Sequence, residues 1–304
     1  MIHATRFSIV TPTYNSERYI GETIKSVISQ VGNFSVEFLV MDGGSTDRTQ
    51  EIVQRYQKLL LENTYPVQCD GVVIHWHSGK DGGMYDAIKK GFARATGDVY
   101  AWINSDDIYL SGAFDIVQRT LEKYPEISWL KGITSYINEN STIYTVGRSN
   151  LYRQDWIRVG LYGPVLHFIQ QDSVFWRAAI WHKSGGVDAK LSLAGDYFLW
   201  KSFAKLAPLY SLKAYVSCFR KVPNQKSADI QAYFREIEKI SPLDKHSSTK
   251  ISRKFNRIES LTRFLRPLCY RLAFGRHQHH LVILEKSVEP YLLEGEYYVL
   301  KDLI

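Results

Sequence analysis

Apolar and polar residues follow two different periods in the first part of the chain. Short apolar runs at 7–11, 36–42, 71–77 and 98–104 are rich in β-branched and aromatic residues, which is typical of buried strands. Between these runs, at 16–30, 45–60 and 83–96, apolar residues recur at the spacing of amphipathic helices. Strands and helices that alternate in this way predict a parallel sheet covered by helices.

The alternation becomes less regular after residue 107. Residues 127–147 predict two strands joined by an Asn-rich turn, and residues 193–207 predict another helix. From about residue 222 onward the sequence is basic and its pattern is helical. We therefore expect an α/β catalytic domain over residues 1–225 and a helical C-terminal extension over residues 226–304.

Polar residues and glycines follow each of the four predicted strands, at Thr11–Asn15, Asp42–Asp47, His77–Gly83 and Asn104–Asp107. Ligands of open α/β sheets bind beyond the carboxyl ends of the strands. One such end is an ordinary turn, but four together predict the wall of a polar ligand site. The sequence has no Gly-x-Gly-x-x-Gly turn after the first strand and no Walker-type Gly-Lys-Ser/Thr. A phosphate group would therefore have to be held in another way.

Asp106 and Asp107 directly follow an apolar strand, although adjacent carboxylates repel each other. A turn in water is one explanation. The other is a divalent cation, Mg²⁺ or Mn²⁺, because such a cation takes one or two carboxylates and completes its coordination with substrate phosphates and water. The three other polar strand ends favour the cation.

Four stretches occur in order: SIVTPTYN, VMDGGSTDRT, GKDGGMYDAIKKGFARATGDVYAWINSDD and QQDSVFWRAAIWHKSGGVDAKLSLAGDYFLW. They resemble the motifs of family 2 inverting glycosyltransferases. The resemblance covers about residues 5–227 and implies a GT-A fold, with a mostly parallel central sheet flanked by helices. It further implies a nucleotide-sugar donor, usually UDP-linked, and a role in bacterial-type surface polysaccharide synthesis.

The resemblance also implies roles for individual residues. Pro12, Thr13 and Tyr14 would line the nucleoside pocket, with Asp42 at the base or ribose. The remaining nucleotide-sugar contacts would be Lys80, Asp81, Asn104 and Ser105, and the metal contacts Asp106 and Asp107. Three positions depart from the family pattern. Asn104 stands where the Asp-x-Asp stretch begins with Asp, and Gly43 stands where many relatives have a second Asp. The His that close relatives usually have near Val222 is absent, although Arg220, Gln225 and Ser227 follow their pattern as candidates to approach the diphosphate or acceptor.

Inverting transfer needs one carboxylate to accept the proton of the acceptor hydroxyl. Asp196 lies near the start of a predicted helix, inside an apolar stretch. An N-cap is one interpretation of that position, and the pattern alone leaves both interpretations open. The resemblance implies the base, because family members have their proposed base here. It also implies that Gln171 and Asp172 border the acceptor.

The chain has 304 residues and a net charge of +7, and much of the positive excess lies near the C-terminus. Basic residues between 251 and 280 accompany an apolar stripe formed by Ile258, Leu261, Leu265, Leu268 and Leu272. This combination is typical of a helix at an anionic membrane surface. Packing on the catalytic domain, or on a second subunit in a homo-oligomer, is the alternative. We expect a glycan or lipid-linked acceptor and no nucleic-acid partner.

Three widely separated cysteines, Cys69, Cys218 and Cys269, form no Cys-x-x-Cys pair and predict reduced thiols. The N-terminal residues lead directly into a strand pattern without a signal peptide, and no apolar run reaches the length of a membrane span. We therefore expect a cytoplasmic protein, at the inner face of the plasma membrane where its acceptor requires it.

Two other functions are compatible with parts of this pattern. A nucleotidyltransferase also uses a metal and a nucleotide, but it usually has a Gly-rich basic loop after its first strand, where this chain has TPTYN. An inactive nucleotide-binding scaffold is the second alternative. The carboxylates Asp42, Asp106 and Asp196 argue against it, because a scaffold needs no base.

Overall fold

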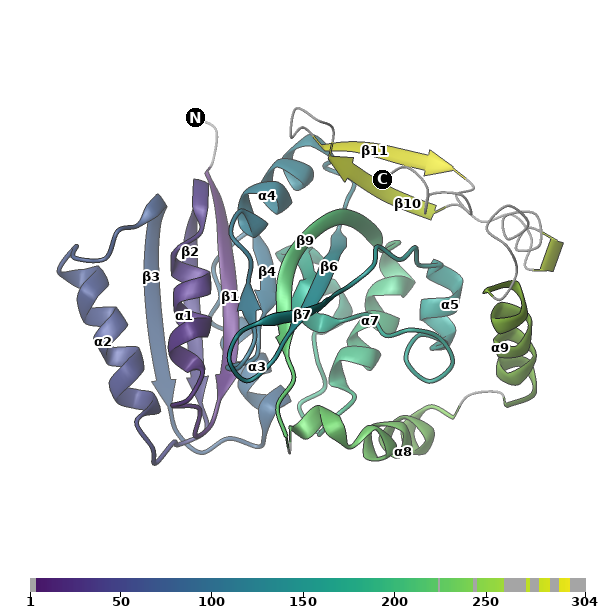
Figure 1. The fold of residues 1–304 in the computed structure, drawn as a ribbon, viewed down its shortest axis with the longest axis horizontal. Helices are drawn as coiled ribbons and strands as arrows, with labels where there is room; N and C mark the ends of the chain where they lie inside the picture. Colours follow the sequence, from purple (N-terminus) through teal and green to yellow (C-terminus); the bar gives the residue numbers. More distant parts are fainter. Residues whose placement is uncertain are drawn as a thin grey trace.

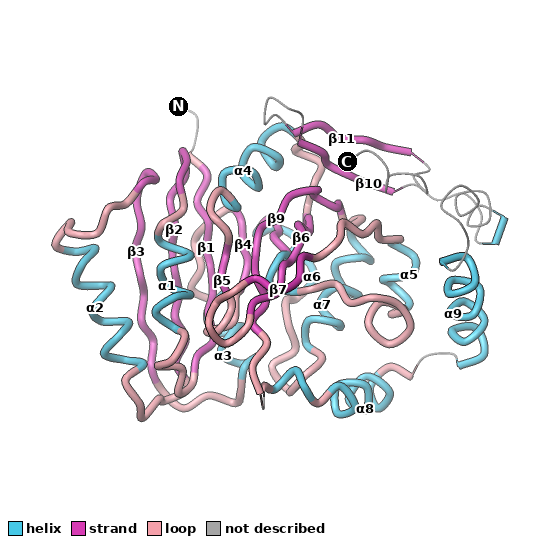
Figure 2. The backbone as a smooth tube through the Cα atoms, viewed as in Figure 1, coloured by secondary structure: helices cyan, strands magenta, loops and turns pink. Residues whose placement is uncertain are grey.

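The computed structural model describes residues 4–223, 225–242, 245–259, 272–273, 279–284 and 290–295. In these residues the strands form one curved sheet with helices around it (Figures 1 and 2). The strand order is β11-β10-β9-β6-β8-β4-β1-β2-β3, and two short strands, β5 and β7, pair with β9 and β6 respectively.

Strands β1 to β4 form the parallel half of the sheet. Their bounds are Thr5–Thr13, Val31–Asp42, Gln68–Ser78 and Val99–Trp102. β1 lies between β2 and β4, and β3 pairs with the other edge of β2, always in parallel. The register places Thr13 beside Asp42, and Asp42 beside Ser78. The predicted parallel sheet is confirmed, and its polar strand ends meet at one edge.

Helices α1, α2 and α3 connect these strands, as predicted, with bounds Ile20–Ile28, Thr49–Leu61 and Met84–Phe92. α1 and α2 begin later than their sequence patterns, because the polar residues before them form the strand-end loops, whereas α3 begins within one residue of its pattern. α1 packs on α2, whereas α3 packs on β1 and β2.

The second half of the sheet is mixed. Its elements in chain order are β5 (Ile108–Tyr109), α4 (Ala113–Lys123), β6 (Trp129–Ile137), β7 (Ile143–Val146), α5 (Gln154–Val159), β8 (Val174–Arg177), α6 (Ala178–Ser184), α7 (Gly195–Leu206) and β9 (Tyr210–Arg220). β6 and β7 form the predicted hairpin. β8 runs antiparallel between β4 and β6, while β6 and β9 are parallel to each other.

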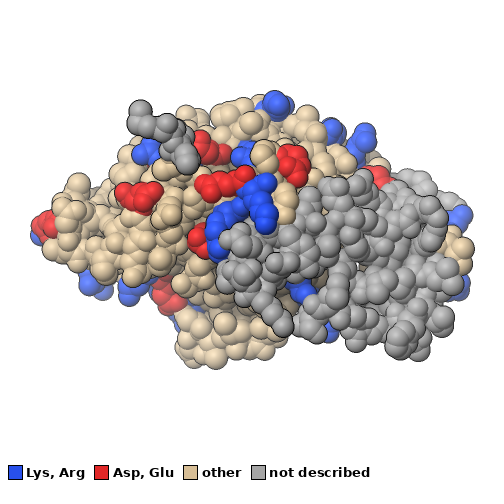
Figure 3. Space-filling model, turned by 90° about the horizontal axis from the view of Figure 1, so that it is seen from above, with Lys and Arg blue, Asp and Glu red and all other residues tan. Residues whose placement is uncertain are grey.

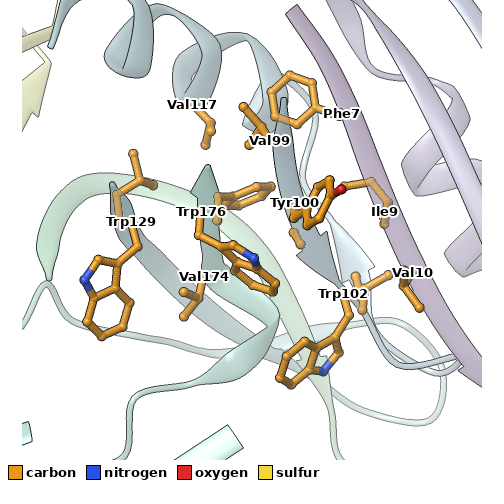
Figure 4. Packing of buried hydrophobic residues seen from close by; sticks show 14 of the residues in the cluster. Phe7, Ile9, Val10, Val99, Tyr100, Trp102, Val117, Trp129, Val174 and Trp176 are labelled. Carbon is orange, nitrogen blue, oxygen red and sulfur yellow. The ribbon is translucent and has the colours of Figure 1, made fainter. Parts of the chain in front are cut away.

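Tryptophan side chains from both halves meet in the core. Trp176 on β8 lies between Trp102 on β4 and Trp129 on β6 (Figure 4). The ring centroid of Trp200 on α7 lies 5.8 Å from that of Trp102, 6.0 Å from that of Trp176 and 5.7 Å from that of Trp129. Buried aromatic rings contribute large apolar areas and preferred ring geometries. This cluster therefore fixes α7 on the sheet and determines where its first turn lies.

The C-terminal extension differs from the helical prediction. Two helices, α8 (Ile230–Ile240) and α9 (Lys245–Glu259), agree with it. However, β10 (His279–Leu284) pairs in parallel with β9, and β11 (Pro290–Gly295) pairs with β10. Val282 is fully buried, and Ile251 and Phe255 of α9 pack against the main core. The run LVIL in β10 is too short to reveal a strand by its period.

Most of the predicted apolar stripe lies outside the described residues. At its end, Leu272 is 78% exposed. Within the described part of the chain, no helix combines the length and apolar character that a membrane span requires. Seen from above, the described surface carries Lys and Arg beside Asp and Glu (Figure 3). The predicted membrane contact stays a prediction.

Candidate active site

The loop after β1 is attached to the loop after β2. The backbone N–H of Asn15 donates to Ser45 Oγ (2.8 Å), and Asn15 adopts a φ of +48°, which Asn tolerates better than most residues. Of the three β1 residues predicted to line a nucleoside pocket, Pro12 and Thr13 are buried, whereas Tyr14 is 62% exposed. Tyr14 is therefore the side chain of this group that can contact a ligand.

Asp42 ends β2 with a carboxylate that is enclosed by donors. It accepts hydrogen bonds from the Ser45 hydroxyl (2.5 Å), the Ser78 hydroxyl (2.6 Å) and the backbone N–H groups of Gly44 and Ser45. Asp42 is only 3% exposed. In this arrangement its side chain holds the loops after β2 and β3 together, so its contact with a base or ribose stays a prediction.

Tyr14 and Asp81 both lie close to Gly43. A Cβ atom on Gly43 would lie 3.5 Å from Tyr14 Cδ2 and 3.1 Å from Asp81 Oδ2. Asp81 also accepts the backbone N–H of Gly83 (2.8 Å), and Lys80 beside it is exposed. An Asp at position 43 would place a second carboxylate against Asp81, which gives a physical reason for glycine here.

The two acidic residues after β4 have different surroundings. Asp107 is fully buried, and its oxygens accept the backbone N–H of Arg220 (2.7 Å) and the side-chain amide of Asn104 (3.2 Å). Burial raises the pKa of Asp107 well above its usual value, and the charge of Asp106 adds to this. Asp106 is partly exposed and accepts a hydrogen bond from Gln225 Nε2 (3.0 Å). Asp106 is therefore the carboxylate that can reach a ligand, while Asp107 stabilises the loop.

This loop fits a divalent cation that takes most of its ligands from the substrate. Asp106 offers a carboxylate, and Asn104 Oδ1 is a buried acceptor without a hydrogen-bond partner among the described residues. Mg²⁺ and Mn²⁺ prefer oxygen ligands of this kind. In the residues that the structure describes, no group of three or more His, Cys, Asp or Glu is arranged to hold a metal. Phosphate oxygens and water would have to complete the coordination.

Arg220 supports the loop that carries Asp106. It is fully buried and donates to the carbonyl of Asp106 (2.7 Å), to the carboxylate of Glu22 (2.7 Å) and to the carbonyl of Asn138 (3.1 Å). The planar guanidinium suits several fixed acceptors at once. Arg220 thus ties β9, α1 and the β6–β7 turn to the loop that carries Asp106.

Asp196 lies in the first turn of α7 and lines a small recess. Aromatic side chains form much of its wall, namely Tyr162, Phe168, Tyr197, Trp200 and Tyr233, and Lys201 adds an ammonium group. Asp196 Oδ1 accepts a hydrogen bond from the Tyr233 hydroxyl (3.2 Å). Burial raises the pKa of Asp196 to about 6, against the lowering effect of that hydrogen bond and of the Tyr197 backbone. Such a carboxylate is ionised at neutral pH and is well matched to accept a proton.

Asp196 is not the N-cap of α7. The N-cap is Ala194, whose side chain cannot accept a hydrogen bond. The backbone N–H groups before the helix are instead bound by Glu236 of α8, which accepts from Ser192 (2.8 Å), Leu193 (2.8 Å) and Ala194 (2.7 Å). The Asp196 carboxylate therefore remains available for another role.

These elements meet around one edge of the sheet. The hydroxyls of Ser16 and Ser105 are 2.8 Å apart and join the loops after β1 and β4. The Tyr85 hydroxyl accepts the backbone N–H of Asp196 (3.4 Å), which joins α3 to α7. In Figure 1, β1 and β3 point toward the edge where α8 also lies. The exposed strand-end residues, Asp106 and Asp196 thus border the same region.

A sequence model described as "Glycosyl transferase family 2" matches residues 8–182. The chain belongs to glycosyl transferase family 2. Its relatives include an uncharacterized glycosyltransferase of Rickettsia typhi, 24% identical over 206 residues that make up 67% of this chain and 60% of that protein. An uncharacterized glycosyltransferase of Mycobacterium tuberculosis is 28% identical over 64% of this chain and 68% of that protein. TuaG of Bacillus subtilis, named for teichuronic acid biosynthesis, is 31% identical over 42% of this chain and 46% of that protein.

The chain thus matches about 60% of the length of the Rickettsia typhi relative. Its fold is similar to that of Staphylococcus aureus TarS, crystallised with UDP-GlcNAc, with a TM-score of 0.56 and 17% identity over 89% of this chain and 80% of that one. The mannosyltransferase PcManGT of Pyrobaculum calidifontis, in complex with GDP-Man and Mn²⁺, gives a TM-score of 0.51 and 16% identity over 90% of this chain and 70% of that one. The predicted GT-A fold is confirmed.

The two residues that the sequence predicts at the acceptor have side chains that bind groups of the protein interior. Asp172 is 2% exposed, and its carboxylate accepts the Ser217 hydroxyl (2.5 Å). Burial lowers the pKa of the neighbouring Lys131 to about 8, and the charge of Asp172 acts in the opposite direction. Gln171 donates to the carbonyl of Trp102. The two side chains attach the short turn at Gln171–Ser173 to β4 and β9, so we do not propose either as an acceptor contact.

Proposed function

We propose that this enzyme transfers a sugar from a nucleoside diphosphate donor to a hydroxyl of a glycan or lipid-linked acceptor, with inversion at the anomeric carbon. UDP is the proposed nucleotide, and surface polysaccharide synthesis is the proposed setting. The observation that carries the proposal is Asp196, a carboxylate that does not cap α7, lines a largely aromatic recess and has a pKa raised to about 6. The TarS complex with UDP-GlcNAc and the name of TuaG support the donor and the setting.

The donor would bind at the loops after β1, β3 and β4. The exposed ring of Tyr14 is suited to stack on a base. Lys80, in the loop after β3, adds an exposed cation next to Asp81. Asp106, with Asn104 beside it, would hold a divalent cation against the diphosphate. Bound there, the cation would neutralise the charge of the departing nucleotide.

Asp196 would accept the proton of the acceptor hydroxyl. As the hydroxyl oxygen forms its bond to the anomeric carbon, the bond from that carbon to the diphosphate oxygen breaks on the opposite face. The diphosphate leaves with the electron pair of that bond, and the hydroxyl proton passes to the Asp196 carboxylate. A single base without a protein nucleophile gives inversion, because only one displacement occurs.

The proposal is tested by comparing Asp196→Asn with Asp188→Asn, a matched change at an exposed carboxylate nearby. A panel of nucleotide sugars with Mn²⁺ first identifies the donor by its hydrolysis. We expect Asp196→Asn to keep the affinity for UDP but to lower transfer by about 10²–10⁴-fold, because Asn cannot accept the proton. The control variant should retain transfer, and NMR of the product should show an inverted anomeric centre. Transfer by Asp196→Asn within about tenfold of wild type would exclude Asp196 as the base.

A further inference from the structure

Helix α8 contacts α7 at several points along its length. Tyr233 binds the carboxylate of Asp196, and Glu236 binds the three N–H groups before α7. At the end of α8, the Ser241 hydroxyl accepts a hydrogen bond from Lys201 of α7 (2.9 Å). Ile237 is 2% exposed and packs with Ala194 and Tyr197 in a small apolar cluster. α8 is therefore fixed to the helix that carries the proposed base.

The segment before α8 is fixed to the other side of the active site. Gln225 donates to the Asp106 carboxylate (3.0 Å) and also to the carbonyl of Arg220 (2.9 Å). Gln225 thus contacts the loop that carries Asp106, while Tyr233 of α8 contacts the proposed base. The family model ends at residue 182, so these contacts come from a part of the chain that the family match does not include.

We propose that α8 is part of the catalytic machinery, with Tyr233 and Glu236 as positioning residues for Asp196. This inference rests on the proposed role of Asp196 as the base. The Tyr233 hydroxyl fixes one carboxylate oxygen of Asp196. Glu236 fixes the chain before α7 through three charge-assisted hydrogen bonds of 2.7–2.8 Å, which are stronger than neutral ones.

The two residues act on Asp196 with opposite electrostatic signs. The Tyr233 hydrogen bond favours the ionised carboxylate and lowers its pKa, whereas the negative charge of Glu236 raises it. Among the described residues, the Tyr85 hydroxyl of α3 accepts the backbone N–H of Asp196, and the Tyr197 backbone also binds its carboxylate. Tyr162, Tyr197 and Lys201 line the same recess. Tyr233→Phe removes one hydroxyl alone, whereas Glu236→Gln removes the charge and also weakens the three hydrogen bonds to the backbone before α7.

The pKa of Asp196 can be measured directly by ¹³C NMR titration of side-chain carboxyls, with Asp196→Asn to assign the signal. We expect Tyr233→Phe to raise this pKa by about one unit, because a hydrogen bond to a charged group is lost. We expect Glu236→Gln to lower it, because a nearby negative charge disappears. The matched controls are Tyr144→Phe at an exposed tyrosine and Glu238→Gln on the exposed face of α8, and both should leave the pKa unchanged.

The pH dependence of kcat should follow these shifts. The acidic limb should move to higher pH in Tyr233→Phe and to lower pH in Glu236→Gln, while the affinity for UDP stays as in wild type. A general loss of structure would not move the two variants in opposite directions. If Glu236→Gln fails to fold by circular dichroism, Tyr233→Phe alone decides the question.

Two results have different meanings. If the pKa of Asp196 is unchanged in Tyr233→Phe, or if both folded variants shift it in the same direction, the positioning role of α8 is wrong. If the pKa shifts as expected but Asp196→Asn still transfers sugar, the base assignment fails while the contact of α8 with Asp196 stands.

Discussion

Replacing Gly195 with alanine should displace the first turn of α7. A Cβ atom at this position would lie 2.6 Å from two ring carbons of Tyr85, whereas ordinary contacts begin at 3.4 Å. The Tyr85 ring cannot easily move away, since it is 2% exposed and its hydroxyl donates to the carbonyl of Leu193 (2.7 Å). α7 would therefore have to shift by about 1 Å, which is costly in a close-packed interior.

The size of the effect follows from two opposing terms. Overpacking lowers the free energy of unfolding by about 1–3 kcal/mol, whereas the higher helix propensity of alanine raises it by at most about 1 kcal/mol. We expect a net loss of about 1–2 kcal/mol, or a Tm lower by about 2–4 °C at about 2 °C per kcal/mol. Transfer should fall more than stability, by up to about 10²-fold, because Asp196 follows Gly195 and moves with it.

Thermal unfolding and initial-rate measurements on Gly195→Ala test this reasoning. The control is Gly71→Ala on β3, where a Cβ atom would have no neighbour within 4 Å. Tyr85→Leu should remove the clash, so Gly195→Ala should be nearly neutral for Tm in that background. A Tm and a transfer rate equal to wild type in the single Gly195→Ala variant would refute the account.

Four further predictions follow from other parts of the structure. kcat should rise as the pH increases through about 6, because Asp196 accepts a proton only in its ionised form and becomes protonated as the pH falls through its pKa. A pH–rate profile tests this, and a flat profile between pH 5 and 7 would contradict it. Asp106→Ala should abolish Mn²⁺-dependent UDP binding in calorimetry, and wild-type affinity with Mn²⁺ would show that the cation is held elsewhere. Arg220→Met should lower the free energy of unfolding by about 3 kcal/mol, which corresponds to a Tm lower by about 6 °C. Arg220→Lys should not restore this stability, because lysine lacks the planar set of donors. An unchanged Tm would mean that the buried contacts of Arg220 are dispensable. The protein should co-sediment with anionic but not with neutral vesicles, and this binding should weaken as salt is added. If the protein stays out of the anionic pellet at low salt, the apolar stripe and its basic residues serve packing or oligomerisation instead.

The parallel half of the fold could be predicted because its signals are local. Apolar runs and helical spacing distinguish strands from helices within a few residues, and alternating elements favour parallel pairing with right-handed connections. The strand-end loops were predicted for the same reason, since parallel strands bring their carboxyl ends to one edge. Asp106 and Asp196 stood out within this frame because each follows or interrupts an apolar stretch.

The tertiary structure decided which of these polar residues are available to a substrate. Asp106 and Asp107 are neighbours in sequence, yet the end of β9 buries one and leaves the other partly exposed. Asp172 carries the same kind of signal, but Ser217 and Lys131 enclose it from strands that lie far away in the chain. Burial depends on partners from distant segments, which no local pattern contains.

The same reason explains the contacts that the sequence did not show at all. Glu236 binds the start of α7 from another helix, and β10 joins the sheet through a pairing with β9. Neither contact leaves a period or a motif at its own position, because each is defined by the element it meets. The sequence by itself determined the elements and the chemistry they carry, whereas the folded chain determined which side chains support the site and which can act in it.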